Sequence, residues 1–154
     1  MQLSSILKPE AVKVFSAASS KKRLFQEIAE LAHATHGLDA PATVEALMER
    51  ESLGPTGVGH GVALPHARLP NLDKVAGVFV MLEKPIDFGA VDRQPVDIAF
   101  ALFAPEDAGV EHLKALALVS RTLREPALCT KLRANLDATT LYAILTEAQS
   151  VQAA

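Results

Sequence analysis

The sequence has little of the material that cross-links a protein or anchors it in a membrane. Cys129 is its only cysteine, so no intrachain disulfide can form, which fits a reducing compartment. This cysteine is most simply a small buried residue on a helix. The longest clean apolar run, residues 75–82, is far shorter than the roughly 20 residues of a membrane-spanning helix. We therefore expect no direct membrane insertion.

Two further features are missing, an excess of basic charge and an export signal. Fifteen Lys and Arg stand against eighteen Asp and Glu, a formal net charge of -3, and the basic residues are scattered. Nucleic acid is therefore not an expected ligand. Residues 1–5 lack a basic segment followed by an apolar stretch, so we expect a cytoplasmic protein.

What the sequence does contain is the composition of one globular domain. The 154 residues are 49% hydrophobic and 21% charged. A compact chain of this length removes roughly 70% of its unfolded surface from water, which suffices for a core without disulfides or a structural metal. We predict a single domain over residues 1–154, with its core at about residues 5–148.

Helix signals come first along the chain. Apolar residues at helical spacing predict a helix over residues 21–36, followed by Gly37 as a stop. Asp39 is then a candidate N-cap, and Pro41 suits the first turn of a second helix. We expect this second helix to end near Ser52.

Strand signals occupy the middle of the chain. Residues 75–82 and 96–103 are apolar without strict alternation, which is typical of central strands covered on both faces, and residues 12–15 suggest a further strand. The order of elements predicts an α/β fold in the α+β sense, a mixed β-sheet with helices packed on its faces. Three later segments are expected to supply helical cover: the stretch that carries Leu113, Leu116, Val119 and Leu123, the segment opened by Pro126, and the segment after Asp137.

A glycine-rich segment interrupts these elements. Residues 54–61 hold four glycines and a proline, so we expect a shaped loop with neither helix nor regular strand. Backbone N–H groups there, with the Thr56 hydroxyl, could face an anion, and a plain tight turn is the alternative. The segment lacks the ending of a Walker loop, so nucleotide binding is not indicated. A short strand at 62–64 then stops at Pro65 and presents His66 at its end.

Three residues are candidates for chemistry. His66 is the first, because a neutral imidazole is a competent nitrogen nucleophile near neutral pH; a histidine that only bonds to backbone is the alternative. Arg50 could hold two phosphate oxygens, or it could be a solvated arginine at a helix C-terminus. His112 could face an anion at a helix start, or it could be a partly exposed helical histidine. With His60, these histidines could supply three zinc ligands, but no ligand motif is present, so we predict no metal site.

Residues 50–68, RESLGPTGVGHGVALPHAR, resemble the segment around the phosphorylated histidine of mannitol/fructose-type enzyme IIA domains of the phosphotransferase system (PTS). Residues 85–88, 94–97 and 112–117 also look like family segments, so the resemblance spans nearly the whole chain. The chain is most similar to the nitrogen-regulatory branch, because it is a free-standing IIA unit whose glycine segment is preceded by Arg-Glu-x-Leu. A free-standing fructose/mannitol-type IIA component of sugar transport is the alternative.

The resemblance implies a function for the three candidate residues. His66 would take a phosphoryl group from a small HPr-like nitrogen phosphocarrier protein, with His112 beside it and Arg50 shaping the phosphate site. The phosphorylation state would then regulate targets such as potassium-transport regulators or sensor kinases. No cofactor is implied and no independent turnover is expected. A binding module that has kept the fold but lost phosphoryl transfer is a further alternative.

The glycine segment would contribute to the same phosphate site by this resemblance. Thr56, Gly57 and His60 are its candidate phosphate-binding residues. His60 stands where asparagine or an acidic residue is expected in the family, so it departs from the pattern.

Overall fold

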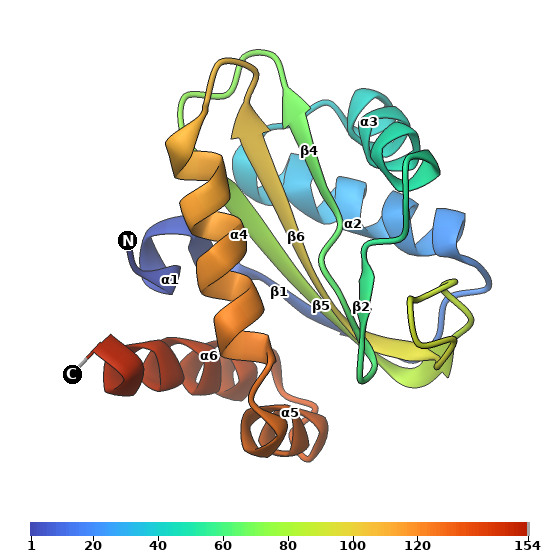
Figure 1. The fold of residues 1–154 in the computed structure, drawn as a ribbon, viewed down its shortest axis with the longest axis vertical. Helices are drawn as coiled ribbons and strands as arrows, with labels where there is room; N and C mark the ends of the chain where they lie inside the picture. The colour runs from blue at the N-terminus through green and yellow to red at the C-terminus, as the bar shows by residue number, and fades with distance from the viewer. Residues whose placement is uncertain (154) are drawn as a thin grey trace.

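A mixed β-sheet forms the centre of the molecule (Figure 1). The computed structural model describes the backbone of residues 1–153 and the side chains of residues 1–147. Within the described residues, six strands form this one sheet: β1 (Leu7–Phe15), β2 (Gly57–Gly59), β3 (Val62–Ala63), β4 (His66–Leu69), β5 (Ala76–Ile86) and β6 (Val96–Pro105).

The strand order is β1-β5-β6-β3-β2, and β4 also pairs with β6. β5 and β6 are antiparallel, whereas β1 is parallel to β5, and β3 and β4 are parallel to β6. Most residues of β5 and β6 are buried. The predicted fold class, a mixed sheet with helices on its faces, is therefore confirmed.

Helices cover both faces of the sheet. Over residues 1–153 the chain forms α1 (Leu3–Ile6), α2 (Lys21–His36), α3 (Ala40–Ser52), α4 (Val110–Leu123), α5 (Pro126–Arg133) and α6 (Ala138–Ala153). α2 lies across one face with α3 beside it, and α4 crosses the other face, with α5 and α6 packed against it (Figure 1). None of the helices in this range combines the length and apolarity needed to cross a membrane.

The predicted ends of the first long helices are confirmed by their caps. The Ser20 side chain accepts a hydrogen bond from the backbone N–H of Arg23, and Gly37 ends α2 in the left-handed conformation at φ +71°. The Asp39 carboxylate accepts from the N–H of Ala42 at the start of α3, and Pro41 lies in its first turn.

The N-terminal region contains more structure than predicted. The strand expected at residues 12–15 is confirmed, but β1 begins at Leu7 and is preceded by the short helix α1, which was not predicted. The pairing of β1 with β5 shifts register between Leu7 and Val12. This irregularity removes the alternation of buried and exposed residues by which a strand is recognised in a sequence.

The glycine-rich segment 54–61 forms part of a hairpin, so the expectation that no regular strand occurs there is wrong. β2 pairs antiparallel with β3 across a two-residue turn at His60 and Gly61. Both turn residues have positive φ, +58° at His60 and +80° at Gly61, which suits a tight hairpin turn. The glycines therefore bend the chain into a pairing geometry instead of preventing one.

β3 and β4 form one interrupted line beside β6. Val62 lies opposite Ile98 and His66 lies opposite Leu102, so the register is the same on both sides of the interruption. Pro65 has no N–H to donate, but its carbonyl accepts from the N–H of Leu102 at 2.9 Å. The prediction of a short strand that ends before Pro65 is therefore confirmed by β3, but the second strand β4, which begins at His66 itself, was not predicted.

Candidate functional site

A surface pocket lies where α3, β4 and the start of α4 meet. Its volume is about 470 Å³, and three of its lining residues are the main candidates of the sequence analysis, Arg50, His66 and His112. Arg50 comes from the last turn of α3, His66 from the first residue of β4, and His112 from the first turn of α4. The sheet register and two helix ends thus bring together residues that are 62 positions apart in the chain.

The ring of His66 is held in one orientation by hydrogen bonds at both nitrogens. Nδ1 lies 2.9 Å from the carbonyl oxygen of Leu64. A carbonyl can only accept, so Nδ1 carries the hydrogen and Nε2 keeps its lone pair. Nε2 in turn accepts from Nε of Arg50 at 3.2 Å. Nε2, which carries no hydrogen, is therefore the nitrogen that faces the Arg50 guanidinium.

The surroundings of His66 favour its neutral form. Burial lowers its pKa from 6.5, and the nearby Arg50 lowers it further, while the hydrogen bond to Leu64 opposes both effects. A neutral imidazole is the form that can act as a nucleophile.

His112 lies beside His66 and is almost fully buried, with 6% of its surface exposed. The two ring centroids are 5.6 Å apart with a tilt of 50°. Burial lowers the pKa of His112, and His66 and Arg68 lower it further. Nδ1 of His112 is buried and has no hydrogen-bond partner within the described residues. Such a group costs free energy unless a partner supplies the missing bond.

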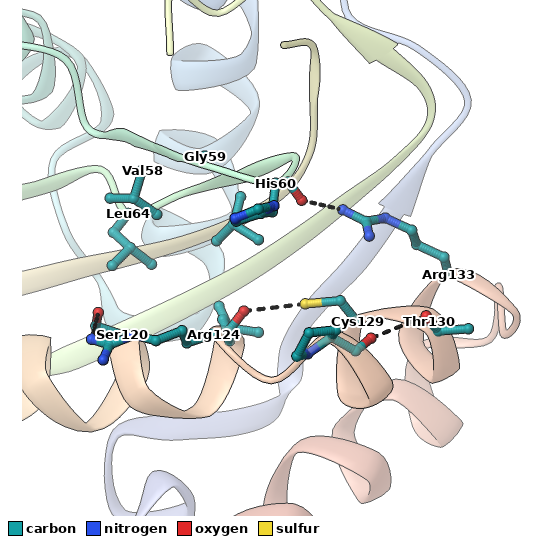
Figure 2. A pocket seen from close by; sticks show the side chains of 12 residues that line it. Val58, Gly59, His60, Leu64, Ser120, Arg124, Cys129, Thr130 and Arg133 are labelled. Atoms are coloured by element: carbon teal, nitrogen blue, oxygen red, sulfur yellow. Dashed lines mark hydrogen bonds between the residues drawn. The ribbon is translucent and has the colours of Figure 1, made fainter. Parts of the chain in front are cut away.

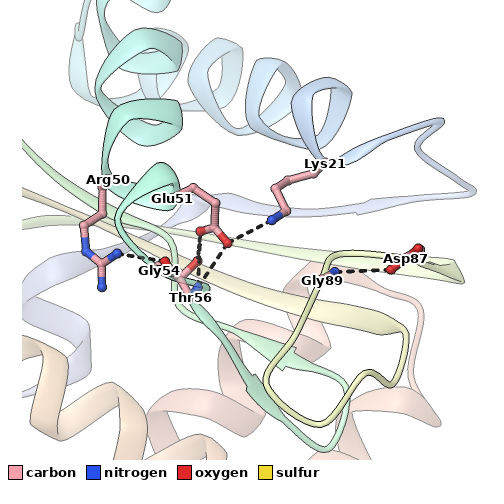
Figure 3. Close-up of polar contacts among 7 residues, drawn as sticks. All are labelled: Lys21, Arg50, Glu51, Gly54, Thr56, Asp87 and Gly89. Carbon is pink, nitrogen blue, oxygen red and sulfur yellow. Dashed lines mark hydrogen bonds and ion pairs between the residues drawn. The ribbon is translucent and has the colours of Figure 1, made fainter.

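The Arg50 guanidinium bridges His66 and the chain that leaves α3. Its Nη1 donates to the carbonyl of Gly54 at 2.9 Å (Figure 3), in addition to the bond from Nε to His66. Within the described residues, Nη2 makes no hydrogen bond. The side chain is thus positioned by two contacts and retains N–H groups for an anion.

Arg68 is a pocket residue to which the sequence analysis assigned no role. It lines the pocket with His66, two residues away on β4, so the two side chains lie on the same face of the strand. Its Nη1 donates to the carbonyls of Glu106 and Ala108, just before α4. The sequence signal that could have identified Arg68 is its position two residues after His66, because side chains two residues apart on a strand share a face.

The loop residues predicted to bind phosphate do not line this pocket. Thr56 is buried, and both its N–H and its hydroxyl donate to the carboxylate of Glu51, which also pairs with Lys21 at 3.0 Å (Figure 3). Gly57 packs so closely that an added Cβ would lie 2.7 Å from Cβ of Ala90. Gly57 therefore allows the chain to pack closely against Ala90, and Thr56 fixes the segment to the carboxylate of Glu51.

His60 is also directed away from His66. It lines a separate cavity, its N–H donates to Asp92 at 2.9 Å, and its carbonyl accepts from Arg133 at 2.8 Å. The structure thus does not bring His60 together with His66 and His112, as the zinc alternative would require. Across the described residues, no three His, Cys, Asp or Glu side chains converge in a way that could hold a metal ion.

Exposed apolar side chains occur near His112 in α4 and, in one case, in the lining of the pocket. Leu53 lines it with 81% of its surface exposed, and Val110 and Leu113, on either side of His112 in α4, are 63% and 64% exposed. Leu113 lies in a helix predicted to cover the sheet, and that helix is confirmed, but this side chain is exposed. Exposed apolar groups around a polar pocket are typical of a protein docking site.

The chain belongs to the EIIA 2 family of the phosphoenolpyruvate-dependent sugar phosphotransferase system, whose family model matches residues 5–148. It is 46% identical over 145 residues to a nitrogen regulatory protein of Bradyrhizobium diazoefficiens, covering 94% of this chain and 95% of the relative. It is 41% identical over 150 residues to that of Escherichia coli (strain K12), covering 97% and 92%.

The solved structures agree with this assignment. The crystal structure of nitrogen regulatory protein IIA-Ntr from Neisseria meningitidis superposes with a TM-score of 0.85 and 34% identity, covering 94% of this chain and 99% of that one. Within the family, the chain is thus of the nitrogen-regulatory IIA type, as the sequence resemblance predicted. Membership of a phosphotransferase family implies a phosphocarrier partner.

Proposed function

We propose that this chain is a phosphocarrier that accepts a phosphoryl group on Nε2 of His66. The donor is the phosphohistidine of an HPr-like nitrogen phosphocarrier protein, and the phosphorylation state then regulates partner proteins. The observation that carries the proposal is the orientation of His66, whose Nδ1–H is held by Leu64 and whose Nε2 lone pair faces the Arg50 guanidinium, a second lining residue of the pocket.

The transfer step follows from this orientation. The lone pair of Nε2 attacks the phosphorus of the donor phosphohistidine in line with the bond that breaks. A new N–P bond forms at His66, and the donor imidazole leaves with the electron pair of the old one. The donor ring carries a hydrogen on its other nitrogen and so leaves as a neutral imidazole. Nδ1 of His66 keeps its hydrogen, so the phosphorylated His66 ring takes over the positive charge that the donor ring gives up.

Two side chains are placed to bind the transferred oxygens. In the unmodified protein, Nε of Arg50 donates a hydrogen bond to the lone pair on Nε2 of His66. As the N–P bond forms at Nε2, this hydrogen bond has to break, and the guanidinium then binds the phosphoryl group instead. The partnerless Nδ1 of His112 gains a bond if it carries a hydrogen and donates it to a phosphoryl oxygen. Both contacts are stronger after transfer than before it, which is the condition for stabilising the product and the transition state.

The surface around the pocket supports docking of a carrier and a change of partners after transfer. Leu53 offers apolar contact area in the pocket, and Val110 and Leu113 offer more on the helix turn that carries His112. Phosphorylation adds about two negative charges at the centre of this surface. A partner that docks on the neutral surface is therefore disfavoured by charge, and one with basic groups is favoured. Regulators of potassium transport and sensor kinases are the target classes that the resemblance suggests.

Intact-mass analysis tests the proposal directly. The protein is incubated with phosphoenolpyruvate, a nitrogen-type enzyme I and its HPr-like carrier, and we expect one acid-labile phosphoryl adduct. His66→Ala should carry none, whereas His36→Ala should label normally, because His36 contacts the backbone of Gly77 outside the pocket. Full labelling of His66→Ala would refute the site.

The same assay with sugar-type enzyme I and HPr addresses the alternative function. We expect the nitrogen-type carrier to phosphorylate this protein faster, since its similar relatives are nitrogen regulatory proteins. Faster labelling by the sugar-type carrier would assign the chain to sugar transport instead. If a carrier shown to be phosphorylated left the chain unlabelled, the chain would be a binding module.

A further inference from the structure

A second cavity is lined by Leu64, two residues before His66. Its volume is about 530 Å³, and it is formed by the β2–β3 hairpin, the end of α4 and the helix α5 (Figure 2). It shares no lining residue with the pocket of His66. We call it the hairpin pocket, and the proposed function makes no use of it.

One part of the hairpin pocket is apolar. Val62, Leu64 and Leu123 line it, and each is buried in the fold. Cys129 adds its thiol, which donates to the carbonyl of Leu123 at 3.2 Å. Burial raises the pKa of this thiol, so it stays uncharged at neutral pH. A cavity with this lining favours an apolar body in the ligand.

The other part of the hairpin pocket is cationic. Arg133 is fixed by its ion pair with Asp97 at 2.9 Å and by its bond to the carbonyl of His60, which ties α5 to the hairpin (Figure 2). Arg124, at the end of α4, makes only a long bond of 3.4 Å to the hydroxyl of Ser120 and no ion pair within the described residues.

Among the residues that the structure describes, no carboxylate lines the hairpin pocket, so its polar part favours an anion. The Arg124 guanidinium is available for a bidentate contact, which matches the two oxygens of a carboxylate. We propose that the hairpin pocket binds a small monocarboxylate with an apolar body. The carboxylate lies on Arg124, and the body packs against Val62, Leu64 and Leu123.

Leu64 connects this ligand site to His66. Its side chain lines the hairpin pocket, while its carbonyl accepts the hydrogen bond from Nδ1 of His66. A ligand that displaces residue 64 therefore changes the length of that bond and, with it, the electron density at Nε2. Binding stands independently of the proposed function, whereas regulation of phosphoryl transfer through this bond rests on it.

Methyl NMR of the unphosphorylated protein tests binding, with phenylacetate as the probe and uncharged phenylacetamide as its matched control. We expect saturable shifts of the Leu64 and Leu123 methyl signals with phenylacetate at millimolar concentrations. Phenylacetamide should bind roughly tenfold more weakly, because it lacks the charge-assisted contact with Arg124.

Variants identify the residue that holds the carboxylate. Arg124→Gln should raise the Kd for phenylacetate roughly tenfold. Arg121→Gln should leave it unchanged, because Arg121 is exposed on the same helix but does not line the pocket. Equal binding of acid and amide, an unaffected Arg124→Gln, or shifts confined to Leu53 and Leu113 would overturn the site.

The connection to His66 has its own readout. Phenylacetate should shift the ring ¹⁵N signals of His66 in parallel with the Leu64 methyls. Saturated methyl shifts with unchanged His66 signals would overturn the coupling. Because neither measurement involves phosphoryl transfer, failure of the proposed function would be seen separately, in the mass assay.

Discussion

At the scale of single residues, the contact between Arg50 and His66 combines two tasks. The Nε of Arg50 donates to Nε2, and Nη1 donates to Gly54, so one planar group orients the nucleophile and links it to the end of α3. A lysine has one charged nitrogen and cannot make both contacts in this geometry while keeping a donor for the phosphoryl group.

We therefore predict that Arg50→Lys lowers the rate of phosphoryl transfer roughly tenfold to a hundredfold, while the fold is retained. Rapid-quench labelling from the phosphorylated carrier measures the rate. Arg121→Lys, which changes an exposed arginine outside the pocket, is the matched control. Equal rates for wild type and Arg50→Lys would remove Arg50 from the site.

His112 shows a conflict between stability and function. Its buried Nδ1 has no partner in the described structure, and leaving such a group without a bond costs about 1–3 kcal/mol. The residue is thus unfavourable for the unmodified fold but suited to a phosphoryl oxygen that arrives later.

His112→Leu should raise the free energy of unfolding at pH 7 by about 1 kcal/mol and slow transfer, since it replaces the partnerless nitrogen with carbon. Urea unfolding measures the first effect and the labelling assay the second. A variant that is both less stable and unaffected in transfer would assign His112 a purely structural role.

At the scale of elements, the glycine-rich segment is explained by packing. An added Cβ at Gly57 would lie 2.7 Å from Cβ and 2.8 Å from Cα of Ala90. The segment 87–95 thus lies directly against β2, and the carbonyl of Gly57 accepts from the N–H of Val91 at 3.0 Å.

We predict that Gly57→Ala lowers the free energy of unfolding by about 1–3 kcal/mol, because the backbone of Ala90 has to move. Gly109→Ala is the control, since a Cβ there meets nothing within 4 Å, and its effect should stay within about 0.5 kcal/mol. Below its melting transition, Gly57→Ala should still be phosphorylated. Loss of labelling in a fully folded variant would instead support a phosphate-binding loop.

At the scale of the whole molecule, three histidines share one electrostatic tendency. Burial is the largest cause of a lowered pKa at His36, His66 and His112. In the unfolded chain these rings take up protons near pH 6.5, whereas in the folded protein they take them up at lower pH. The unfolded state therefore binds more protons in this window, and stability falls as the pH falls through it.

The free energy of unfolding should accordingly be constant above about pH 7 and decrease from about pH 6.5 downward. Urea midpoints measured across this range check the prediction. His112→Leu should show a shallower decrease than wild type, because one of the three groups is gone. Constant stability between pH 7 and pH 5 would show that the three pKa values are not lowered.

Several parts of the fold follow from local sequence alone. Ser20, Gly37, Asp39 and Pro41 define the ends of α2 and α3, because capping depends on groups within a few residues of one another. The apolar runs of β5 and β6 also identify buried strands, because each run is a continuous stretch of the sequence. By contrast, the first half of β1 escapes prediction, since a register shift against β5 removes its periodicity. The helix α1 escapes prediction because its four residues are too few to show a helical period.

The site shows the same division between local pattern and tertiary contact. The sequence by itself determined the family, the identity of His66, His112 and Arg50 as candidates, and the helices that carry Arg50 and His112. Only the tertiary structure decided which nitrogen of His66 is free, because the carbonyl of Leu64 selects the tautomer. It also brought Arg68 into the pocket and directed His60 into another cavity, since neighbours across a sheet depend on register, which no short stretch of sequence contains.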